Sequence, residues 1–61
     1  MGPLPKLMTV AEVAKVLRLN TVTVQRRMAR GDLPGHKVGG QWRMKYDDLT
    51  AVIEGTWEPE Q

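Results

Sequence analysis

The sequence predicts one small domain that is mostly α, with a single β-hairpin, in the order helix, turn, helix, hairpin, helix. Two short amphipathic segments separated only by Arg18-Leu19-Asn20 predict the helix pair. A Gly39-Gly40 pair between two short segments of mixed polarity predicts the hairpin, because both central residues of a type I′ turn need positive φ. A third apolar-periodic segment follows and completes the order.

The length of 61 residues and the absence of cysteine limit what this domain can be. A chain of this size buries only about 60% of the surface that its unfolded form exposes, so its core is small. Without cysteine it has neither disulfides nor thiolate metal ligands, and the single histidine, His36, does not make a zinc site alone. We therefore expect one domain, with no metal and no cofactor.

The first helix is expected over residues 10–17. Thr9 and Glu12 have the spacing of a capping box. The apolar residues that follow include steps of three and four positions, which is the helical period; they are Val10, Ala11, Val13, Ala14, Val16 and Leu17. Residues 1–7 contain two prolines and a glycine, and we expect them to form an extended lead.

The second helix is expected over residues 21–30, with Asn20 as its N-cap and Gly31 as its stop. The alternation Thr-Val-Thr-Val at its start also fits a strand, but the cap, the glycine and the short link to the first helix favour a helix. Val24 and Met28 are expected to face the first helix. The opposite, exposed side then carries Val22, Gln25, Arg26, Ala29 and Arg30.

The hairpin is expected to follow a turn at residues 32–35, with strands at 36–38 and 41–44 and an apolar face made by Val38, Trp42 and Met44.

A third helix is expected from Asp48 to about Glu54, capped by Asp47 and stopped by Gly55. Its inward residues are expected to be Leu49, Val52 and Ile53. Residues 56–61 form an acidic tail that we expect to be mobile. Residues 8–55 thus predict a winged helix-turn-helix, in which the hairpin is the wing.

Charge is distributed unevenly along the chain. Residues 15–45 carry eight bases and one acid, a net charge of +7, whereas residues 46–61 carry five acids and no base, a net charge of −5. A basic middle with an acidic end is typical of a nucleic-acid binder. The alternative is a solvated basic surface without a partner.

Chemical motifs favour binding over catalysis. The sequence holds no Ser/His/Asp set and no phosphate-binding glycine loop, and the adjacent carboxylates of Asp47 and Asp48 diverge at a helix start, where they favour its N-terminus. We expect no enzymatic activity. Nor does any apolar run reach the length of a membrane span, and the N-terminus does not resemble a secretory signal, so we expect no membrane partner and a cytoplasmic location.

DNA binding has a direct physical account. An exposed side of the second helix can enter the major groove, where Arg26 can bind guanine and Gln25 can bind adenine, each through two hydrogen bonds. Arg27, Arg30 and Lys15 can reach phosphates. The candidate DNA-binding residues are Thr21, Val22, Thr23, Gln25, Arg26, Arg27, Ala29 and Arg30 on the helix, and Lys37, Gly39, Gly40, Gln41 and Arg43 on the hairpin.

Several of these residues have a purely structural alternative. The stem of Arg27 can cover the first helix, and Arg43 can pair with Asp47 or Asp48. Trp42 is expected to be a core residue instead of a platform for base stacking, and His36 a turn residue instead of a pH switch. The hydroxyls of Thr21 and Thr23 can act only as acceptors for the backbone amides at the helix start.

The run Met8-Thr9-Val10-Ala11-Glu12-Val13-Ala14 resembles the opening of excisionase-type DNA-binding domains, relatives of the MerR-like winged helices. The resemblance covers about residues 8–53 and continues through Asn20, Thr23-Val24, Arg30-Gly31-Asp32-Leu33-Pro34, Val38-Gly39-Gly40-Gln41-Trp42-Arg43-Met44 and Asp48-Leu49. It implies that the second helix enters the major groove and that the wing contacts the adjacent backbone or minor groove. Val22, Arg26 and Ala29 match the groove-facing stripe.

Short members of this family resemble excisionases of phages and mobile elements. They bind repeated sites near an attachment site, bend the DNA and direct a tyrosine integrase toward excision. The resemblance therefore implies double-stranded DNA, a tyrosine integrase and neighbouring protomers as partners, in the cytoplasm of a bacterial host. The alternatives are a small transcription regulator of the same fold, and a module that docks an acidic protein.

This sequence departs from the family pattern at two positions. Arg18 stands where a helix-ending glycine is usual, which implies backbone strain or a different turn. Gln25 stands in place of a common aromatic residue, which makes it a candidate base reader.

Overall fold

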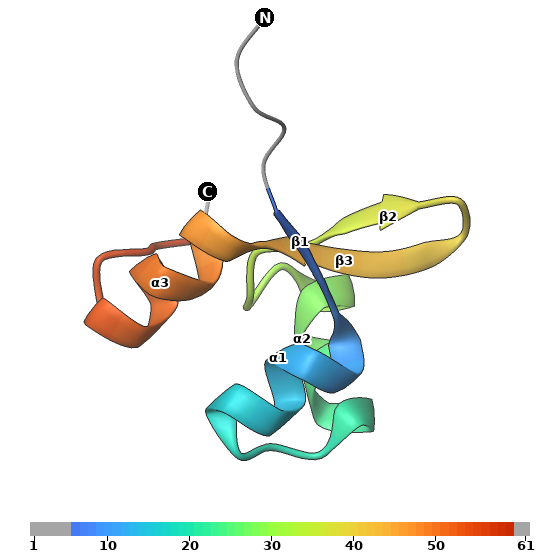
Figure 1. The fold of residues 1–61 in the computed structure, drawn as a ribbon, viewed down its shortest axis with the longest axis horizontal. Coiled ribbons are helices and arrows are strands. Elements are labelled where there is room, and N and C mark those ends of the chain that lie inside the picture. The colour runs from blue at the N-terminus through green and yellow to red at the C-terminus, as the bar shows by residue number, and fades with distance from the viewer. Residues whose placement is uncertain (1–5, 60–61) are drawn as a thin grey trace, which may run out of the picture.

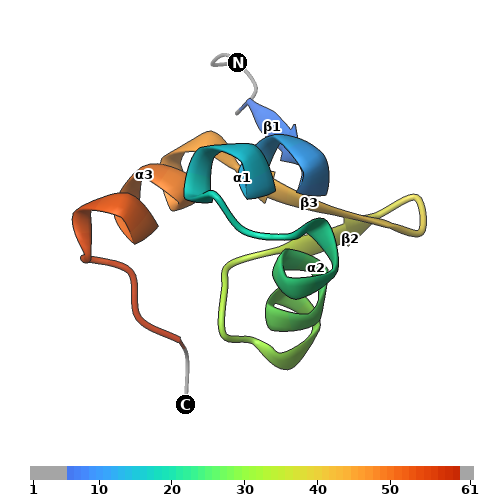
Figure 2. The ribbon, with the colours of Figure 1, turned by 90° about the horizontal axis from the view of Figure 1, so that it is seen from below.

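The computed structural model describes residues 6–59, which form a winged helix-turn-helix of three helices and a three-stranded antiparallel sheet (Figure 1). The elements are β1 (Leu7–Thr9), α1 (Val10–Leu17), α2 (Thr21–Arg30), β2 (His36–Val38), β3 (Gln41–Lys45) and α3 (Tyr46–Glu54). The strand order is β1-β3-β2. The helices α1 and α2 lie on one side of the sheet, and α3 lies at the end away from the hairpin tip (Figures 1 and 2).

The core lies between the sheet and the helices, and all the elements except β2 contribute to it. It is built from apolar side chains that are nearly or fully buried: Met8, Val13, Ala14, Val24, Met28, Leu33, Met44 and Leu49. Three of these, Met44, Val13 and Val24, have no exposed surface. The core thus ties α1 and α2 to β3, which fixes the surface of α2 relative to the hairpin.

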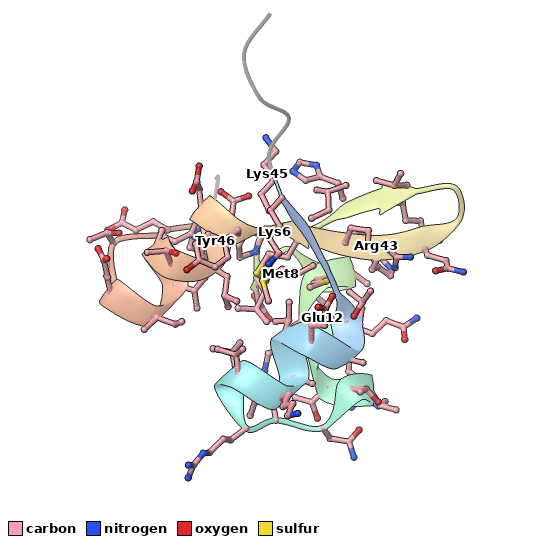
Figure 3. All side chains as sticks on the ribbon, viewed as in Figure 1. Lys6, Met8, Glu12, Arg43, Lys45 and Tyr46 are labelled. Carbon is pink, nitrogen blue, oxygen red and sulfur yellow. The ribbon has the colours of Figure 1, made fainter. Side chains whose placement is uncertain are left out.

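The helix α1 begins at the predicted capping box. The Thr9 hydroxyl accepts a hydrogen bond from the Glu12 amide at 3.1 Å, and the Thr9 amide donates to Glu12 Oε1 at 2.9 Å. Figure 3 shows Glu12 at this end of α1, below β1. The bond from the Thr9 amide stabilises the carboxylate and holds the pKa of Glu12 below its ordinary value of 4.5, with a smaller contribution from the Thr9 hydroxyl.

We expect acid to weaken the start of α1 through Glu12. A carboxyl group whose pKa is lower in the folded chain stabilises the fold above its unfolded pKa, and this contribution is lost as the pH falls through the folded pKa. Urea unfolding at about pH 7 and about pH 3 should therefore show a smaller loss of stability in Glu12→Gln than in the wild type, because glutamine keeps a capping-box acceptor without a titrating group. An identical loss in both proteins would contradict this role.

The end of α1 has the strained backbone that its sequence implies. Arg18 is left-handed, with φ 57° and ψ 43°, and among the described residues it is the single non-glycine with positive φ. Its amide and that of Leu19 both donate to the Ala14 carbonyl, the latter at 2.9 Å, and so complete the end of the helix. Arg18 therefore occupies a position that glycine would fill without strain.

Arg18→Gly is expected to raise the free energy of unfolding by about 1 kcal/mol. A left-handed conformation costs an ordinary residue roughly 1–2 kcal/mol, and the extra entropy that glycine loses on folding offsets part of the gain. Thermal and urea unfolding would measure the change. Arg18→Ala is the matched control, because it removes the guanidinium but keeps the strain, and equal stability of the two variants would rule out the backbone explanation.

The second segment is a helix, as predicted, and it has the predicted bounds. The side chain of Asn20 accepts a hydrogen bond from the Val22 amide at 2.8 Å. Gly31 ends the helix with φ 85°. Val24 and Met28 are buried in one cluster with Val13 and Ala14 of α1, as expected of residues that face the first helix.

The hairpin turns at Gly39 and Gly40, whose φ angles of 61° and 83° confirm the predicted turn. The prediction that Val38 shares an apolar face with Trp42 and Met44 is wrong. A two-residue turn places Val38 opposite Gln41, so Val38 lies on the same face as Gln41 and is half exposed. Lys37 is instead the residue that pairs with Trp42.

The strand β1 was not expected as a separate element. Leu7–Thr9 pairs antiparallel with β3, and Met8 lies opposite Met44 in the core. The strand falls partly in the segment expected to be an extended lead, of which residues 1–5 lie outside the described residues. The Lys6 carbonyl also accepts a hydrogen bond from the Tyr46 amide at 2.9 Å.

The helix α3 begins two residues earlier than predicted, at Tyr46, and Asp47 is not its cap. Lys45 occupies the N-cap position, because β3 passes directly into α3. It makes no side-chain hydrogen bond to the helix, since an ammonium group has no acceptor for the helix amides. Leu49 is buried and Val52 packs against the core, as predicted. Ile53 is 60% exposed, contrary to the prediction, because it lies in the last turn of α3, at the end of the helix away from β3.

The segment after α3 is attached to that helix at Trp57. Gly55 ends the helix as predicted, with φ 77°. The Trp57 amide donates to the Ala51 carbonyl at 3.2 Å, and its side chain is half-buried. The mobility expected of residues 56–61 remains a prediction, and residues 60 and 61 lie outside the described part of the chain.

Candidate nucleic-acid interface

The outward side of α2 is centred on Arg26. Successive residues of a helix are about 100° apart, so Arg26 lies about 180° from the buried pair Val24 and Met28. Val22 and Ala29 flank it on the same exposed side. Val22 is 57% exposed, so this side presents apolar surface as well as a guanidinium. Such a surface supplies a hydrogen-bond donor and apolar contacts, and base edges in a major groove can accept both.

The two flanks of α2 have different surroundings. Gln25 lies on the flank toward the hairpin, where it lines a groove shared with the wing. Arg27 is exposed on the other flank. Arg30 is exposed in the last turn and forms an ion pair with Asp32, with 2.6 Å between Nη2 and Oδ2. An exposed pair of this kind contributes little to stability, so Arg30 can exchange Asp32 for a phosphate at small cost.

The wing projects beyond the helices and ends at Gly39 and Gly40 (Figure 1). A Cβ atom added at either glycine would meet no other atom within 4 Å, so the positive φ angles, and not crowding, favour glycine here. The tip carries no side chain, which leaves its backbone free to approach a partner closely.

Two cationic side chains of the wing reach the same side of it. Lys37 shares the inner face with Trp42, and its Nζ lies 5.8 Å from the centroid of the indole ring. Arg43, the next residue along β3, starts on the opposite face, but its guanidinium folds back along the strand to the Trp42 carbonyl and lines the same side as Lys37. Its Nη2 donates to Gln41 Oε1 at 2.7 Å and its Nη1 donates to the Trp42 carbonyl at 3.0 Å. The wing thus holds two cations in defined positions before any partner binds.

The alternative that Arg43 pairs with Asp47 or Asp48 is wrong. Its guanidinium extends along β3 toward the wing tip (Figure 3), whereas both aspartates follow the strand at its other end, in the first turn of α3. Within residues 6–59, Arg30 and Asp32 form the one ion pair.

A groove of about 330 Å³ separates α2 from the wing. It brings together five of the predicted site residues and the residues that begin α1. The lining consists of Thr9, Val10, Ala11, Gln25, Lys37, Gly40, Gln41, Trp42 and Arg43. No acidic residue is part of this lining.

The structure places the predicted site residues on one helix and one hairpin, and nearly all of them at the surface. Thr23 and Arg43 are half-buried, and the exposed residues are Thr21, Val22, Gln25, Arg26, Arg27, Ala29, Arg30, Lys37, Gly39, Gly40 and Gln41. The groove joins Gln25 of α2 to four residues of the hairpin, Lys37, Gly40, Gln41 and Arg43. Thr21, Arg27 and Arg30 lie elsewhere on α2.

Trp42, predicted to be a core residue, also belongs to the groove. It does pack against the core, but it is only half-buried and also lines the groove. The signal for this was in the sequence: across a two-residue turn at Gly39-Gly40, Lys37 pairs with Trp42. Trp42 therefore packs against the core, as predicted, and also lines the groove.

No helix within residues 6–59 combines the length and the apolar character that a lipid bilayer crossing requires. In the same part of the chain, no three His, Asp or Glu side chains gather closely enough to hold a metal ion.

Comparison with known proteins decides the family. A family model described as "Helix-turn-helix domain" matches residues 7–56, which is most of the chain. The chain belongs to this family. The match begins at β1 and ends just after α3, so the helix-turn-helix domain includes both the wing and the sheet to which it is joined.

Two curated relatives extend this assignment. They come from two strains of Mycobacterium tuberculosis and carry the names "Putative DNA-binding protein Rv0500A" and "Putative DNA-binding protein MT0521". Each is 44% identical to this helix-turn-helix domain over 52 residues, which cover 85% of this chain and 67% of the relative. The similarity therefore extends over nearly the whole described fold.

Proposed function

We propose that this protein binds double-stranded DNA with α2 in the major groove and the wing on the adjacent backbone or minor groove. The observation that carries the proposal is the placement of Arg26 at the centre of the exposed side of α2, beside a wing whose glycine tip projects past the helices. The names of the two relatives support the same activity. The protein performs no chemistry of its own in this proposal.

Within DNA binding, we propose the role of an excisionase. The motif run from Met8 to Ala14 and the segment from Val38 to Met44 resemble those of excisionases. The charge distribution adds support, because α3 and the residues after it carry Asp47, Asp48, Glu54 and Glu58 without a base. These acids lie away from the wing tip (Figure 1), where a tyrosine integrase or a neighbouring protomer can contact the protein while it holds DNA.

A mobility-shift experiment on fragments that span an attachment site tests this role. An excisionase that occupies repeated sites cooperatively produces a ladder of complexes on this DNA. It should also raise the yield of excision by the cognate tyrosine integrase in a purified reaction. Complexes confined to a promoter fragment, with no effect on excision, would instead support the alternative of a small transcription regulator.

A salt titration separates DNA binding from the third alternative, a module that docks an acidic protein. Binding to phosphates releases counterions, so the affinity for DNA should fall steeply as salt rises, for random sequences as well as for a cognate site. A protein with no measurable affinity for either DNA at low salt would favour the docking alternative.

A further inference from the structure

If the proposed DNA binding holds, the position of the groove between α2 and the wing indicates what the groove binds. When a helix occupies a major groove and a wing reaches the neighbouring minor groove, one sugar–phosphate strand runs between them, because that strand is the wall that separates the two grooves. In this protein, the space between α2 and the wing is the groove of about 330 Å³. When the wing reaches the minor groove, the strand therefore passes along this groove of the protein.

The groove is suited chemically to a phosphate. Lys37 and Arg43 supply positive charge, and the amides of Gln25 and Gln41 supply neutral donors. The nearest described carboxylate in sequence is Glu12, which follows the lining residue Ala11. Its carboxylate accepts a hydrogen bond from the Thr9 amide and is also attracted to Arg43, so Lys37 supplies the groove's positive charge more fully than Arg43 does.

Trp42 places one of these cations. The Nζ atom of Lys37 lies 5.8 Å from the centroid of the indole ring, within the range of about 6 Å in which a ring attracts a cation. The ring is itself fixed, because Trp42 packs against the core and pairs with Lys37 across the hairpin. A lysine ammonium on a flexible four-carbon stem is thereby confined to the groove side of the wing.

We propose that the α2–wing groove seats a phosphate of the DNA strand between the two DNA grooves, and that Trp42 is a positioning residue which holds Lys37 on that phosphate. Trp42 then affects DNA affinity although it carries no charge and needs no contact with a base. This assigns it a role that neither its burial nor its aromatic character alone would give.

The test measures the association constant for a random-sequence duplex at several salt concentrations. The plot of log K against log salt has a negative slope. Lys37→Gln should reduce the magnitude of this slope by about 0.9, the value of one lost phosphate contact. Trp42→Leu should also reduce the slope, although the net charge is unchanged, and Trp42→Phe should give an intermediate slope because its ring attracts a cation less strongly. Lys45→Gln is the matched control.

Lys45→Gln removes one positive charge from the same sheet. The Lys45 side chain, however, lies on the side of the sheet away from α1 and α2 (Figure 3), and it does not line the groove. Its substitution should leave the slope unchanged. The double variant Lys37→Gln/Trp42→Leu should match Lys37→Gln alone, because a positioning residue has nothing left to position. Thermal unfolding of each variant confirms that the compared proteins are folded, and Trp42→Phe provides the comparison if Trp42→Leu does not fold.

An unchanged slope in Lys37→Gln would overturn the phosphate seat. A Trp42 substitution whose effect persists in full after Lys37 has been replaced would overturn the positioning role and leave a structural one. Both results differ from failure of the proposed function, in which the wild-type protein itself shows no salt-dependent binding to DNA.

Discussion

Replacing Met44 with alanine is expected to lower the free energy of unfolding by about 2–5 kcal/mol. Met44 has no exposed surface and lies in β3, the strand that pairs with both β1 and β2. Alanine would leave a cavity between Met8, directly opposite, and the helices that cover the sheet. A domain of this length has a total stability of roughly 3–9 kcal/mol, so this single change should remove a large share of it.

Urea unfolding followed by far-UV circular dichroism measures this effect, and two controls define it. Met44→Leu conserves volume and should cost less than about 1.5 kcal/mol. Val38→Ala truncates a half-exposed residue of the same hairpin and should stay within about 0.5 kcal/mol of the wild type. If Met44→Ala unfolded at the same urea concentration as Val38→Ala, Met44 would not be the packing centre that its burial indicates.

Features specified by neighbouring residues could be predicted from the sequence. The capping box of Thr9 and Glu12, the Asn20 cap and the positive φ at Gly31 each depend on contacts within a few positions, and they fixed the bounds of α1 and α2. The turn at Gly39-Gly40 is local in the same sense. These are the signals that predicted the winged helix-turn-helix.

Features that depend on distant partners could not be predicted. The strand β1 is three residues long and exists because β3, more than thirty positions later, pairs with it. The start of α3 depends on the same pairing, since the Tyr46 amide bonds to the Lys6 carbonyl where the strands end. The expectation that Asp47 caps α3 relied on residue preference alone, and the direct passage from β3 into the helix overrides that preference.

The candidate site shows the same division. The helical period was enough to place Arg26 opposite Val24 and Met28, because a helix fixes which residues share a side. The groove between α2 and the wing could not be read in this way, because its width depends on how the hairpin packs against α1 and α2. Trp42 illustrates the consequence, since the hairpin turns one face of a core residue toward the groove.

Arg26→Ala is expected to weaken binding to the cognate site by about 1–3 kcal/mol, which corresponds to a loss of roughly 5- to 150-fold in affinity, provided that the proposed DNA binding holds. Arg26 lies at the centre of the exposed side of α2, away from the core. Its guanidinium can donate two hydrogen bonds to one guanine, a contact that no phosphate-bound residue replaces. The loss should be accompanied by relaxed discrimination at one position of the site.

Arg27→Ala is the matched control for this prediction, because it removes the same charge from the adjacent position of the same helix. Arg27 lies on the flank of α2 away from the wing, where we expect a phosphate contact. Its substitution should weaken binding to cognate and random duplexes by the same factor. It should also reduce the magnitude of the slope of log K against log salt by about 0.9. Arg26→Ala should instead reduce the ratio between the cognate and random affinities, as measured by fluorescence anisotropy at one fixed salt concentration. If Arg26→Ala also left that ratio unchanged, Arg26 would not read a base, and sequence recognition would have to lie with Gln25 or with the wing.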